Sequence, residues 1–303
     1  VSLSRLAQLF ASPSGGNLEA IAKASQACEV DLICRSATDT ALANTGRAVA
    51  KMTFSDGQGG GTYLCTGTLL NTTTSSLVPY FYSAHHCMST QASANTLTTH
   101  WFYDRAVCGS GSQGSSYVQV TGGAQLLYSN AAADALLLRL NAAPPAGAIF
   151  SGWDANTVPT GTALTAVHHP AGDYKKVSLG SMLGYGSYVD SSANFIVSGW
   201  NSTATGVTEG GSSGSGIFSA VGQPAQEYRL RGGLLGGPSS CAASGNDLRD
   251  YYSRLDLVFP AIAQYLSPSS GCTYSLSPTS VTVGAGTATG TVSVNTTAGC
   301  SWT

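Results

Sequence analysis

Short apolar segments alternate with polar, glycine-rich segments along most of this chain. Between about residues 46 and 259, runs of apolar or β-branched residues are separated by Gly, Ser, Asn and Pro. These runs cover residues 48–54, 63–70, 77–83, 136–140, 163–167, 195–200 and 228–235. Many short strands bounded by turn residues are typical of an all-β sandwich or barrel. The pattern therefore predicts an all-β main domain.

The two ends of the chain carry other patterns. Apolar residues recur at near-helical spacing in residues 255–266, which predicts a closing helix, and a shorter helical pattern runs from Leu3 to Phe10. Residues 267–271 have the composition of a linker, and residues 272–303 again alternate as a strand does. A β segment of that size needs a staple or a missing remainder to be stable. We expect one main domain with a small β attachment.

Charge narrows the classes of partner. Charged residues make up only 9% of the 303 residues, and the net charge is −2, against a usual charged fraction of about 25%. There is no basic patch for nucleic acid, and no apolar run long enough to span a bilayer. The sequence opens at Val1 without Met, so we expect an export segment to have been removed or left out. A local site, and not the overall charge, must then select the protein or peptide that binds. The expected oligomeric state is a monomer.

The eight cysteines indicate an oxidising compartment. They form an even set without a CxxC pair and without the Cys/His spacing of a zinc site. In a Gly/Ser-rich chain this favours four disulfides over scattered buried thiols, and it predicts a secreted protein.

A candidate nucleophile lies in the run Glu209-Gly210-Gly211-Ser212-Ser213-Gly214-Ser215. Glycines on both sides of Ser213 permit a turn that aims backbone N–H groups into a pocket and leave the hydroxyl accessible. The N–H groups of Gly211 and Ser213 would then stabilise an oxyanion. A surface loop is the alternative interpretation, and it is a strong one because Ser and Gly abound here.

Two upstream residues complete a catalytic set. His86, which precedes Cys87, would be the base, and Asp134, at the start of an apolar strand, would orient it. Adjacent side chains on an extended segment face opposite ways, so His85 is expected to be a core residue. A turn carboxylate is the alternative for Asp134. The order His, Asp, Ser is that of chymotrypsin-type proteases.

Several motifs together resemble the bacterial lysyl endopeptidases of the chymotrypsin superfamily. The resemblance covers about residues 28–266, and its motifs are Cys65-Thr66-Gly67, Ser83-Ala84-His85-His86-Cys87, His168-His169-Pro170, residues 208–215 and Gly236-Gly237-Pro238-Ser239-Ser240-Cys241. It implies a secreted serine endopeptidase of two orthogonal β-barrels with the site between them. It also implies three disulfides, Cys28–Cys241, Cys34–Cys108 and Cys65–Cys87. Cys272 and Cys300 have no counterpart and are left to pair with each other.

The resemblance implies a specificity pocket for basic side chains. Asp250 takes the place of its basal aspartate, with Thr208 and Gly236 among the pocket residues. A buried carboxylate favours a cationic substrate side chain; a salt bridge of Asp250 with Arg249 or Arg254 is the competing interpretation, and Asp247 is a second candidate acid. Leu235 replaces the family's histidine, and Tyr185 is expected in place of its aromatic partner. We therefore expect cleavage after Lys, with Arg accepted as well.

Three further expectations follow. The resemblance implies that the mature enzyme begins at Ala24, so Lys23–Ala24 is the expected maturation bond. Residues 1–23 would then be a propeptide remnant or arm, and 24–266 the protease domain. Residues 267–303 would be a linker followed by a partial β module that resembles the BACON type. Adjacent histidines suit one ion poorly, so His168 and His169 are not expected to bind a metal, and no cofactor is expected. A catalytically weak binding protein, attached to glycan or cell surface by the β tail, is the alternative function.

Overall fold

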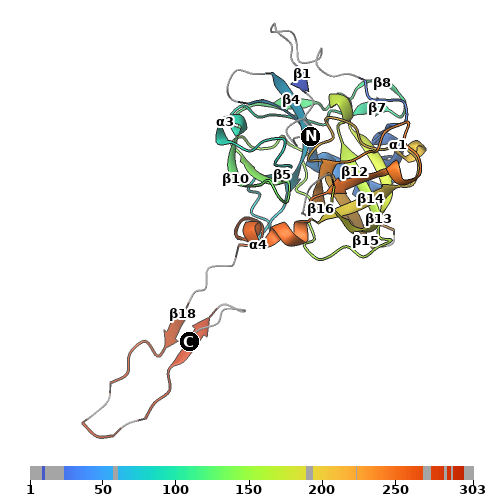
Figure 1. Ribbon diagram of the computed structural model, residues 1–303. Helices are drawn as coiled ribbons and strands as arrows, with labels where there is room; N and C mark the ends of the chain where they lie inside the picture. Colours follow the sequence, from blue (N-terminus) through green and yellow to red (C-terminus); the bar gives the residue numbers. More distant parts are fainter. Residues whose placement is uncertain are drawn as a thin grey trace.

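The computed structural model describes residues 9–10, 24–56, 61–188, 194–222, 224–268, 274–282, 285–287 and 289–296. Its strands form two antiparallel sheets that make the two lobes of the body (Figure 1). This is the two-barrel architecture of chymotrypsin-type proteases, as predicted from the short apolar runs and the motifs.

The first lobe contains an eight-stranded sheet and a separate two-stranded hairpin. Its pairing order is β10-β11-β5-β4-β3-β6-β9, with β1 beside β4. The strands are β1 (Leu9–Phe10), β3 (Val49–Ser55), β4 (Thr62–Leu70), β5 (Tyr80–Ser83), β6 (Thr98–Trp101), β9 (Val118–Val120), β10 (Ala124–Asn130) and β11 (Ala135–Leu140); β7 (Arg105–Val107) and β8 (Ser110–Gln113) form a separate hairpin. The helix expected from Leu3 to Phe10 is wrong at its described end, because Leu9 and Phe10 pair with Thr62 and Tyr63 as strand; so short a helix has little intrinsic stability.

The second lobe is a closed barrel. Six strands follow the order β12-β15-β16-β17-β14-β13, and β13 pairs back onto β12, while β2 extends the sheet beyond β13. The strands are β2 (Val30–Asp31), β12 (Ala163–His168), β13 (Lys176–Gly186), β14 (Phe195–Trp200), β15 (Gly216–Val221), β16 (Glu227–Gly236) and β17 (Arg249–Tyr252). Closure leaves the barrel strands without free edges.

Helices are few and mostly short. They are α1 (Ile33–Ser36), α2 (Thr40–Ala48), α3 (Gln91–Ala94) and α4 (Leu255–Leu266), with single 3₁₀ turns at η3 (Pro170–Gly172), η4 (Thr203–Thr205) and η5 (Gly245–Asp247). The closing helix is confirmed as α4, whose apolar face packs against both lobes. Helix α2 was not predicted; it starts at Asp39, whose carboxylate accepts the N–H of Leu42 at 2.8 Å as an N-cap does.

The apolar run in β11 shows why the lobes stay together. Leu136 and Leu138 point into the core of the first lobe, whereas Ala135 and Leu137 point into a separate core shared by both lobes and α4. Successive strand residues face opposite sides, so a strand buried on both faces is continuously apolar. The strand that begins after Asp134 is therefore fixed on both sides.

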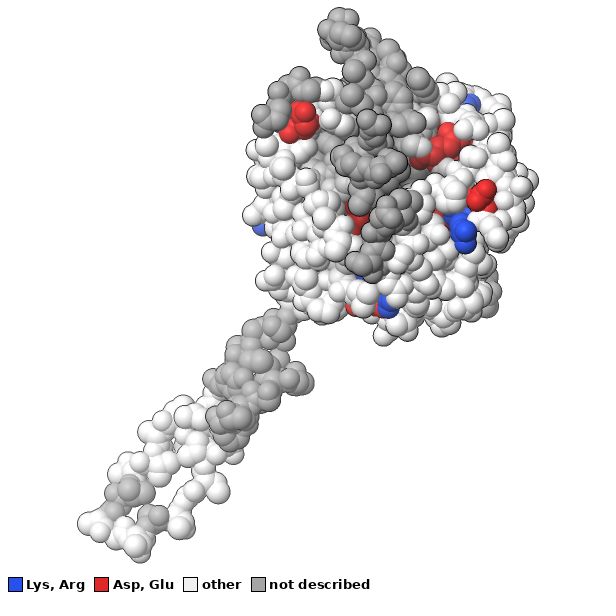
Figure 2. Space-filling model, in the orientation of Figure 1, with Lys and Arg blue, Asp and Glu red and all other residues white. Residues whose placement is uncertain are grey.

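The tail and the surface add two observations. Strands β18 (Tyr274–Ser277) and β19 (Ser293–Thr296) pair as a hairpin that lies apart from the body (Figure 1), and Leu276 on it is exposed. Acidic and basic residues are thinly scattered over the face seen in Figure 2. No helix in the described part of the chain is long and apolar enough to cross a membrane.

Candidate active site

Two consecutive tight turns present Ser213. The N–H of Ser212 donates to the carbonyl of Glu209 at 3.0 Å, and the N–H of Ser215 donates to the carbonyl of Ser212 at 2.9 Å. Gly211 and Gly214, each the third residue of its turn, have φ of 94° and 76°. Only glycine adopts such angles readily, which explains their spacing. Ser213 is the second residue of the second turn.

The same turns leave two N–H groups facing outward. The carbonyl of Gly210 accepts from Ala171 N at 2.6 Å, and that of Ser212 accepts from Ser215 N at 2.9 Å. In a trans peptide the N–H points opposite to the C=O, so the N–H groups of Gly211 and Ser213 point away from these partners. Within the described residues neither N–H donates a hydrogen bond. Such a pair can bind a developing oxyanion.

His86 and Asp134 form a bonded pair on the first lobe. Asp134 accepts the backbone N–H of His86 through Oδ1 at 2.9 Å and contacts His86 Nδ1 through Oδ2 at 2.8 Å. Their side chains are 3% and 4% exposed. Asp134 has a φ of 47°, a left-handed conformation that Asp tolerates better than most residues. The carboxylate thus fixes both the loop and the ring of His86.

Thr66 of β4 holds the Ser213 turn against the histidine loop. Its N–H donates to the carbonyl of Ser213 at 2.8 Å, and its hydroxyl donates to the carbonyl of Gly211 at 3.0 Å. The adjacent Cys65 is bonded to Cys87, the neighbour of His86. Ser213 and His86 are therefore tied to one point of β4. Among the described residues the Ser213 hydroxyl and the His86 ring are not hydrogen-bonded to each other, as is common between a nucleophile and its base in the absence of substrate.

His85 has a different partner. Its Nδ1 contacts the hydroxyl of Ser129 on β10 at 2.7 Å, and burial lowers the pKa of its ring. His86 is the member of the pair that contacts Asp134.

Asp250 is fully buried in the second lobe. Its Oδ2 accepts from Trp200 Nε1 at 2.6 Å, Ser239 Oγ at 2.6 Å and Thr208 Oγ1 at 2.8 Å. Its Oδ1 has no hydrogen-bond partner among the described residues, and a Cβ added at Gly237 would lie 2.3 Å from it. Burial raises the pKa of Asp250, although the three donors oppose that effect. The carboxylate is thus held by one oxygen and covered at the other by a residue without a side chain.

The competing salt bridge of Asp250 is absent among the described residues. Arg254 pairs with Asp256 instead, and Arg249 makes no ion pair with Asp250. Asp247 lies in η5, where it is exposed. Asp250 therefore has only neutral donors as partners.

Tyr185 and Leu235, both expected beside the specificity pocket, pack in different clusters. The hydroxyl of Tyr185 contacts Val158, accepting its N–H at 2.7 Å, and the guanidinium of Arg254 lies 3.8 Å from the ring centroid. Leu235 is 1% exposed and packs in another cluster, against Tyr251 and Tyr188. Leu234, the neighbour of Leu235 on β16, packs in the cluster of Tyr185, because successive strand residues face opposite sides. Gly236 ends β16 with a φ of 143°.

The structure holds three of the four expected disulfides. They are Cys28–Cys241, Cys34–Cys108 and Cys65–Cys87. Cys272 and Cys300, and Lys23 of the expected maturation bond, lie outside the described residues, whereas Ala24 is the first residue of the described segment 24–56.

Several residues around the site escaped sequence reasoning. Trp200 and Ser239 donate to Asp250, Tyr188 stacks on Tyr251 with ring centroids 4.8 Å apart, and Thr66 clamps the Ser213 turn. Thr66 and Ser239 stood in recognised motifs, which was a usable signal. Nothing in the sequence points to Trp200 or Tyr188.

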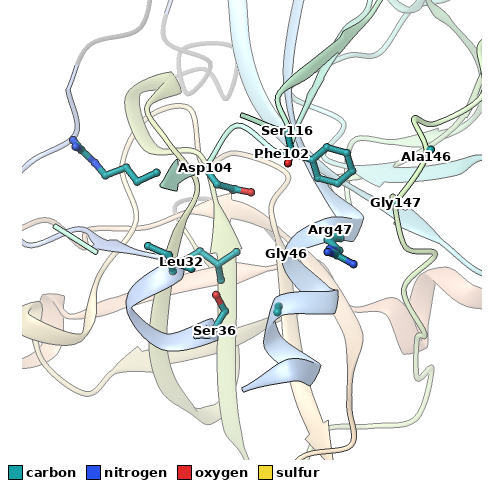
Figure 3. A pocket seen from close by; sticks show the side chains of 12 residues that line it. Leu32, Ser36, Gly46, Arg47, Phe102, Asp104, Ser116, Ala146 and Gly147 are labelled. Carbon is teal, nitrogen blue, oxygen red and sulfur yellow. The ribbon is translucent and has the colours of Figure 1, made fainter. Parts of the chain in front are cut away.

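A separate hollow of about 290 Å³ lies between helices α1 and α2 and the segment after β6 (Figure 3). Leu32, Arg47 and Phe102 are among its lining residues, and none of the predicted site residues lines it. Across the described residues no cluster of His, Cys, Asp and Glu is arranged to hold a metal ion.

A two-barrel fold with a bonded His–Asp pair, and a serine beside two N–H groups that donate no hydrogen bond within the described residues, is the arrangement that serine proteases of chymotrypsin type use. The family model described as "Lysyl endopeptidase, C-terminal domain" matches residues 22–253. The chain belongs to this family.

A curated relative supports the family, and solved structures support the fold. The lysyl endopeptidase of Pseudomonas aeruginosa is 43% identical over 248 residues, which are 81% of this chain and 53% of that protein. The chain thus spans about half the length of this curated relative. Among solved structures, "HtrA-type protease AlgW with tripeptide" has a TM-score of 0.51 at 16% identity, covering 77% of this chain and 65% of that one. The active form of the Rv3671c protease from M. tuberculosis has a TM-score of 0.50 at 14% identity, covering 84% and 92%. These two likenesses concern the fold alone.

Proposed function

We propose that this protein is a secreted endopeptidase that cleaves peptide bonds after lysine, and after arginine as well, through a His86–Asp134–Ser213 triad. Ser213 attacks the scissile carbonyl, His86 accepts its proton and returns it to the leaving amine, and Asp134 orients the ring. The N–H groups of Gly211 and Ser213 stabilise the oxyanion. The observation that carries the proposal is the bonded His86–Asp134 pair facing a serine turn with two unpaired N–H groups.

Asp250 is the proposed selector of the basic side chain. Its Oδ1 is buried without a donor, and a cation entering beside Gly237 would provide one. An ammonium or guanidinium would also offset the burial that raises the pKa of Asp250. The name of the relative, lysyl endopeptidase, favours lysine. Leu235, an apolar residue of the nearby wall, does not itself distinguish the two cations.

Secretion is supported by the three disulfides, since such bonds persist in oxidising compartments. We further propose 24–266 as the catalytic domain, 1–23 as a removed arm, and 267–303 as an attachment.

The test is turnover of fluorogenic peptides that differ only in the residue before the cut. Lys and Arg peptides should be hydrolysed and Ala, Leu and Glu peptides should not, and Ser213→Ala should abolish turnover while leaving the unfolding midpoint close to that of wild type. Equal and negligible turnover by wild type and Ser213→Ala would favour the binding-protein alternative. Hydrolysis independent of the residue before the cut would overturn the specificity assignment alone.

A further inference from the structure

A chain of hydrogen bonds runs behind the Ser213 turn through a buried histidine. His168 ends β12 and is 0% exposed. One ring nitrogen, Nδ1, lies 2.8 Å from Ser212 Oγ, and the other, Nε2, lies 2.9 Å from Ser178 Oγ. Ser212 is the residue between Gly211 and Ser213, so the ring reaches the middle of the turn.

Both serines also form a hydrogen bond with the backbone of the segment before Ser213. Ser178 Oγ donates to the carbonyl of Val207 at 2.6 Å. Ser212 Oγ accepts the N–H of Glu209 at 3.3 Å. The histidine thus fastens the segment 207–212 at two points.

The partners determine which ring nitrogen carries the proton. A carbonyl can only accept, so the hydroxyl proton of Ser178 is committed to Val207, and Ser178 must accept from His168 Nε2–H. In a neutral ring Nδ1 then accepts the hydroxyl proton of Ser212, whose oxygen remains available to Glu209 N–H. In this one arrangement each donor and acceptor of the hydrogen-bond series through His168 has a partner.

The surroundings keep the ring neutral. Burial and the nearby Lys176 lower the pKa of His168 to about 3. Glu29 Oε2 lies 3.8 Å from His168 Nε2, and burial raises the pKa of Glu29 to about 9, with Glu209 and Asp250 adding to the effect and Lys176 opposing it. An uncharged Glu29 does not draw a second proton onto the ring. A protonated ring would leave the hydroxyl proton of Ser212 without its acceptor.

We infer that His168 is a positioning residue for the oxyanion site: as a neutral ring it fixes residues 207–212 so that the N–H groups of Gly211 and Ser213 face the substrate carbonyl. This inference rests on the proposed role of those two groups. Loss of the ring nitrogens frees Ser212 to rotate, and the peptide groups on either side turn with it. Substrate affinity at Asp250 should be spared, because Thr208 is held separately by Asp250 and Ser239.

The experiment compares His168→Phe with His168→Asn. Phenylalanine keeps a ring and removes both contacts, while asparagine keeps an acceptor near the place of Nδ1. We expect kcat for a lysyl amide substrate to fall at least about tenfold in His168→Phe, with KM within about twofold of wild type and partial recovery in His168→Asn. Ser212→Ala should have a similar effect, and the double variant should be no worse than the more damaged single one.

A matched control exists in the other lobe. His100 is 2% exposed and contacts two hydroxyls, Thr53 Oγ1 at 2.9 Å and Tyr117 Oη at 2.8 Å, and burial lowers the pKa of its ring to about 3. His100→Phe therefore removes the same kind of contacts at a ring that makes no hydrogen bond to the Ser213 turn. We expect it to lower the unfolding midpoint without changing kcat.

Inhibitor binding separates a local effect from a general loosening. A peptidyl lysinal forms a hemiacetal with Ser213 and uses the oxyanion site, whereas n-butylamine occupies only the specificity pocket. In His168→Phe we expect weaker lysinal binding and unchanged butylamine inhibition. Unchanged kcat, or equal losses for both inhibitors, would overturn the inference. If His168→Phe does not fold, Ser178→Ala and Ser212→Ala decide it by the same readouts. Absent turnover in wild type would overturn the proposed function instead.

Discussion

The unpartnered Oδ1 of Asp250 makes a sharp prediction at the residue scale. Asp250→Asn keeps the shape of the side chain and removes the charge that a substrate cation would meet. We expect kcat/KM for Lys and Arg peptides to fall about 30- to 1000-fold, which corresponds to a loss of about 2 to 4 kcal/mol. Initial rates over a range of peptide concentrations measure this change. Asp247→Asn, at an exposed acid of η5 just before β17, is the control and should have no effect. Survival of lysine preference in Asp250→Asn would show that another group selects the substrate.

Glu29 predicts how stability depends on pH. Its side chain is 0% exposed, and burial raises its pKa from 4.5 to about 9, with Glu209, Asp250 and Lys176 as the charged groups around it. Between these two values the unfolded chain has released the proton that the folded protein keeps. The contribution of this group to stability is therefore complete below about pH 4.5 and declines as pH rises to about 9, by at most about 1.4 kcal/mol per pH unit.

Glu29→Gln removes that titration. The variant should gain stability relative to wild type as pH rises, so its advantage should be larger at pH 8 than at pH 5. Urea unfolding of both proteins at the two pH values measures the difference. A constant difference between the two proteins would mean that Glu29 does not hold its proton in the folded state.

Strand β4 joins the lobes at the site, and two of its threonines allow a controlled test at the scale of elements. Thr66 is fully buried, and its hydroxyl donates to Gly211 O and accepts from His169 N. Thr68 is also fully buried, but its hydroxyl has no partner. Thr66→Val leaves a buried carbonyl and N–H unpaired, which costs about 1–3 kcal/mol, whereas Thr68→Val removes a hydroxyl that bonds nothing.

We expect Thr66→Val to lower both the unfolding midpoint and kcat, and Thr68→Val to leave kcat unchanged and stability equal or higher. Thermal unfolding and steady-state kinetics of the two variants check this. Equal effects of the two substitutions would show that Thr66 packs β4 without positioning the Ser213 turn.

Local pattern predicted the elements well where it repeats over several residues. The strands expected at 63–70, 136–140 and 195–200 correspond to β4, β11 and β14, and α4 covers the expected residues 255–266. Contacts between distant segments set the rest. Helix α2 depends on a side-chain cap at Asp39, and Trp200 reaches Asp250 across fifty residues. Tyr185 was placed by analogy with a motif, and its direction from β13 could not be read from sequence spacing.

The whole molecule divides the site between its lobes. His86 and Asp134 belong to the first lobe, and Ser213 and Asp250 to the second. Their order along the chain suggested a common site, but their closeness in space depends on the core that both lobes share with α4. Substitutions in that core should therefore affect activity before either barrel unfolds.

The residues just after Ala24, the proposed N-terminus of the mature enzyme, are bonded to the second lobe. Ser25 donates through N–H and hydroxyl to Asp173 at 3.0 and 2.8 Å, and the N–H of Gln26 donates to Glu209 at 3.0 Å. Cys28 is bonded to Cys241. An α-ammonium created at Ala24 would therefore lie beside acidic groups that already hold its neighbours, which favours a processed end at this position.

We predict that the active enzyme begins at Ala24, released by cleavage after Lys23. A protease that cuts after lysine can perform this step itself, so the precursor of Ser213→Ala should stay unprocessed until active enzyme is added. The Lys23→Gln precursor should be cleaved neither by itself nor by added active enzyme. N-terminal sequencing and intact mass measure each outcome. Lys176, whose side chain is 5% exposed and pairs with Asp31 and Asp173, is a lysine that should stay uncut in the folded protein. An active enzyme whose N-terminus lies upstream of Ala24 would contradict the prediction.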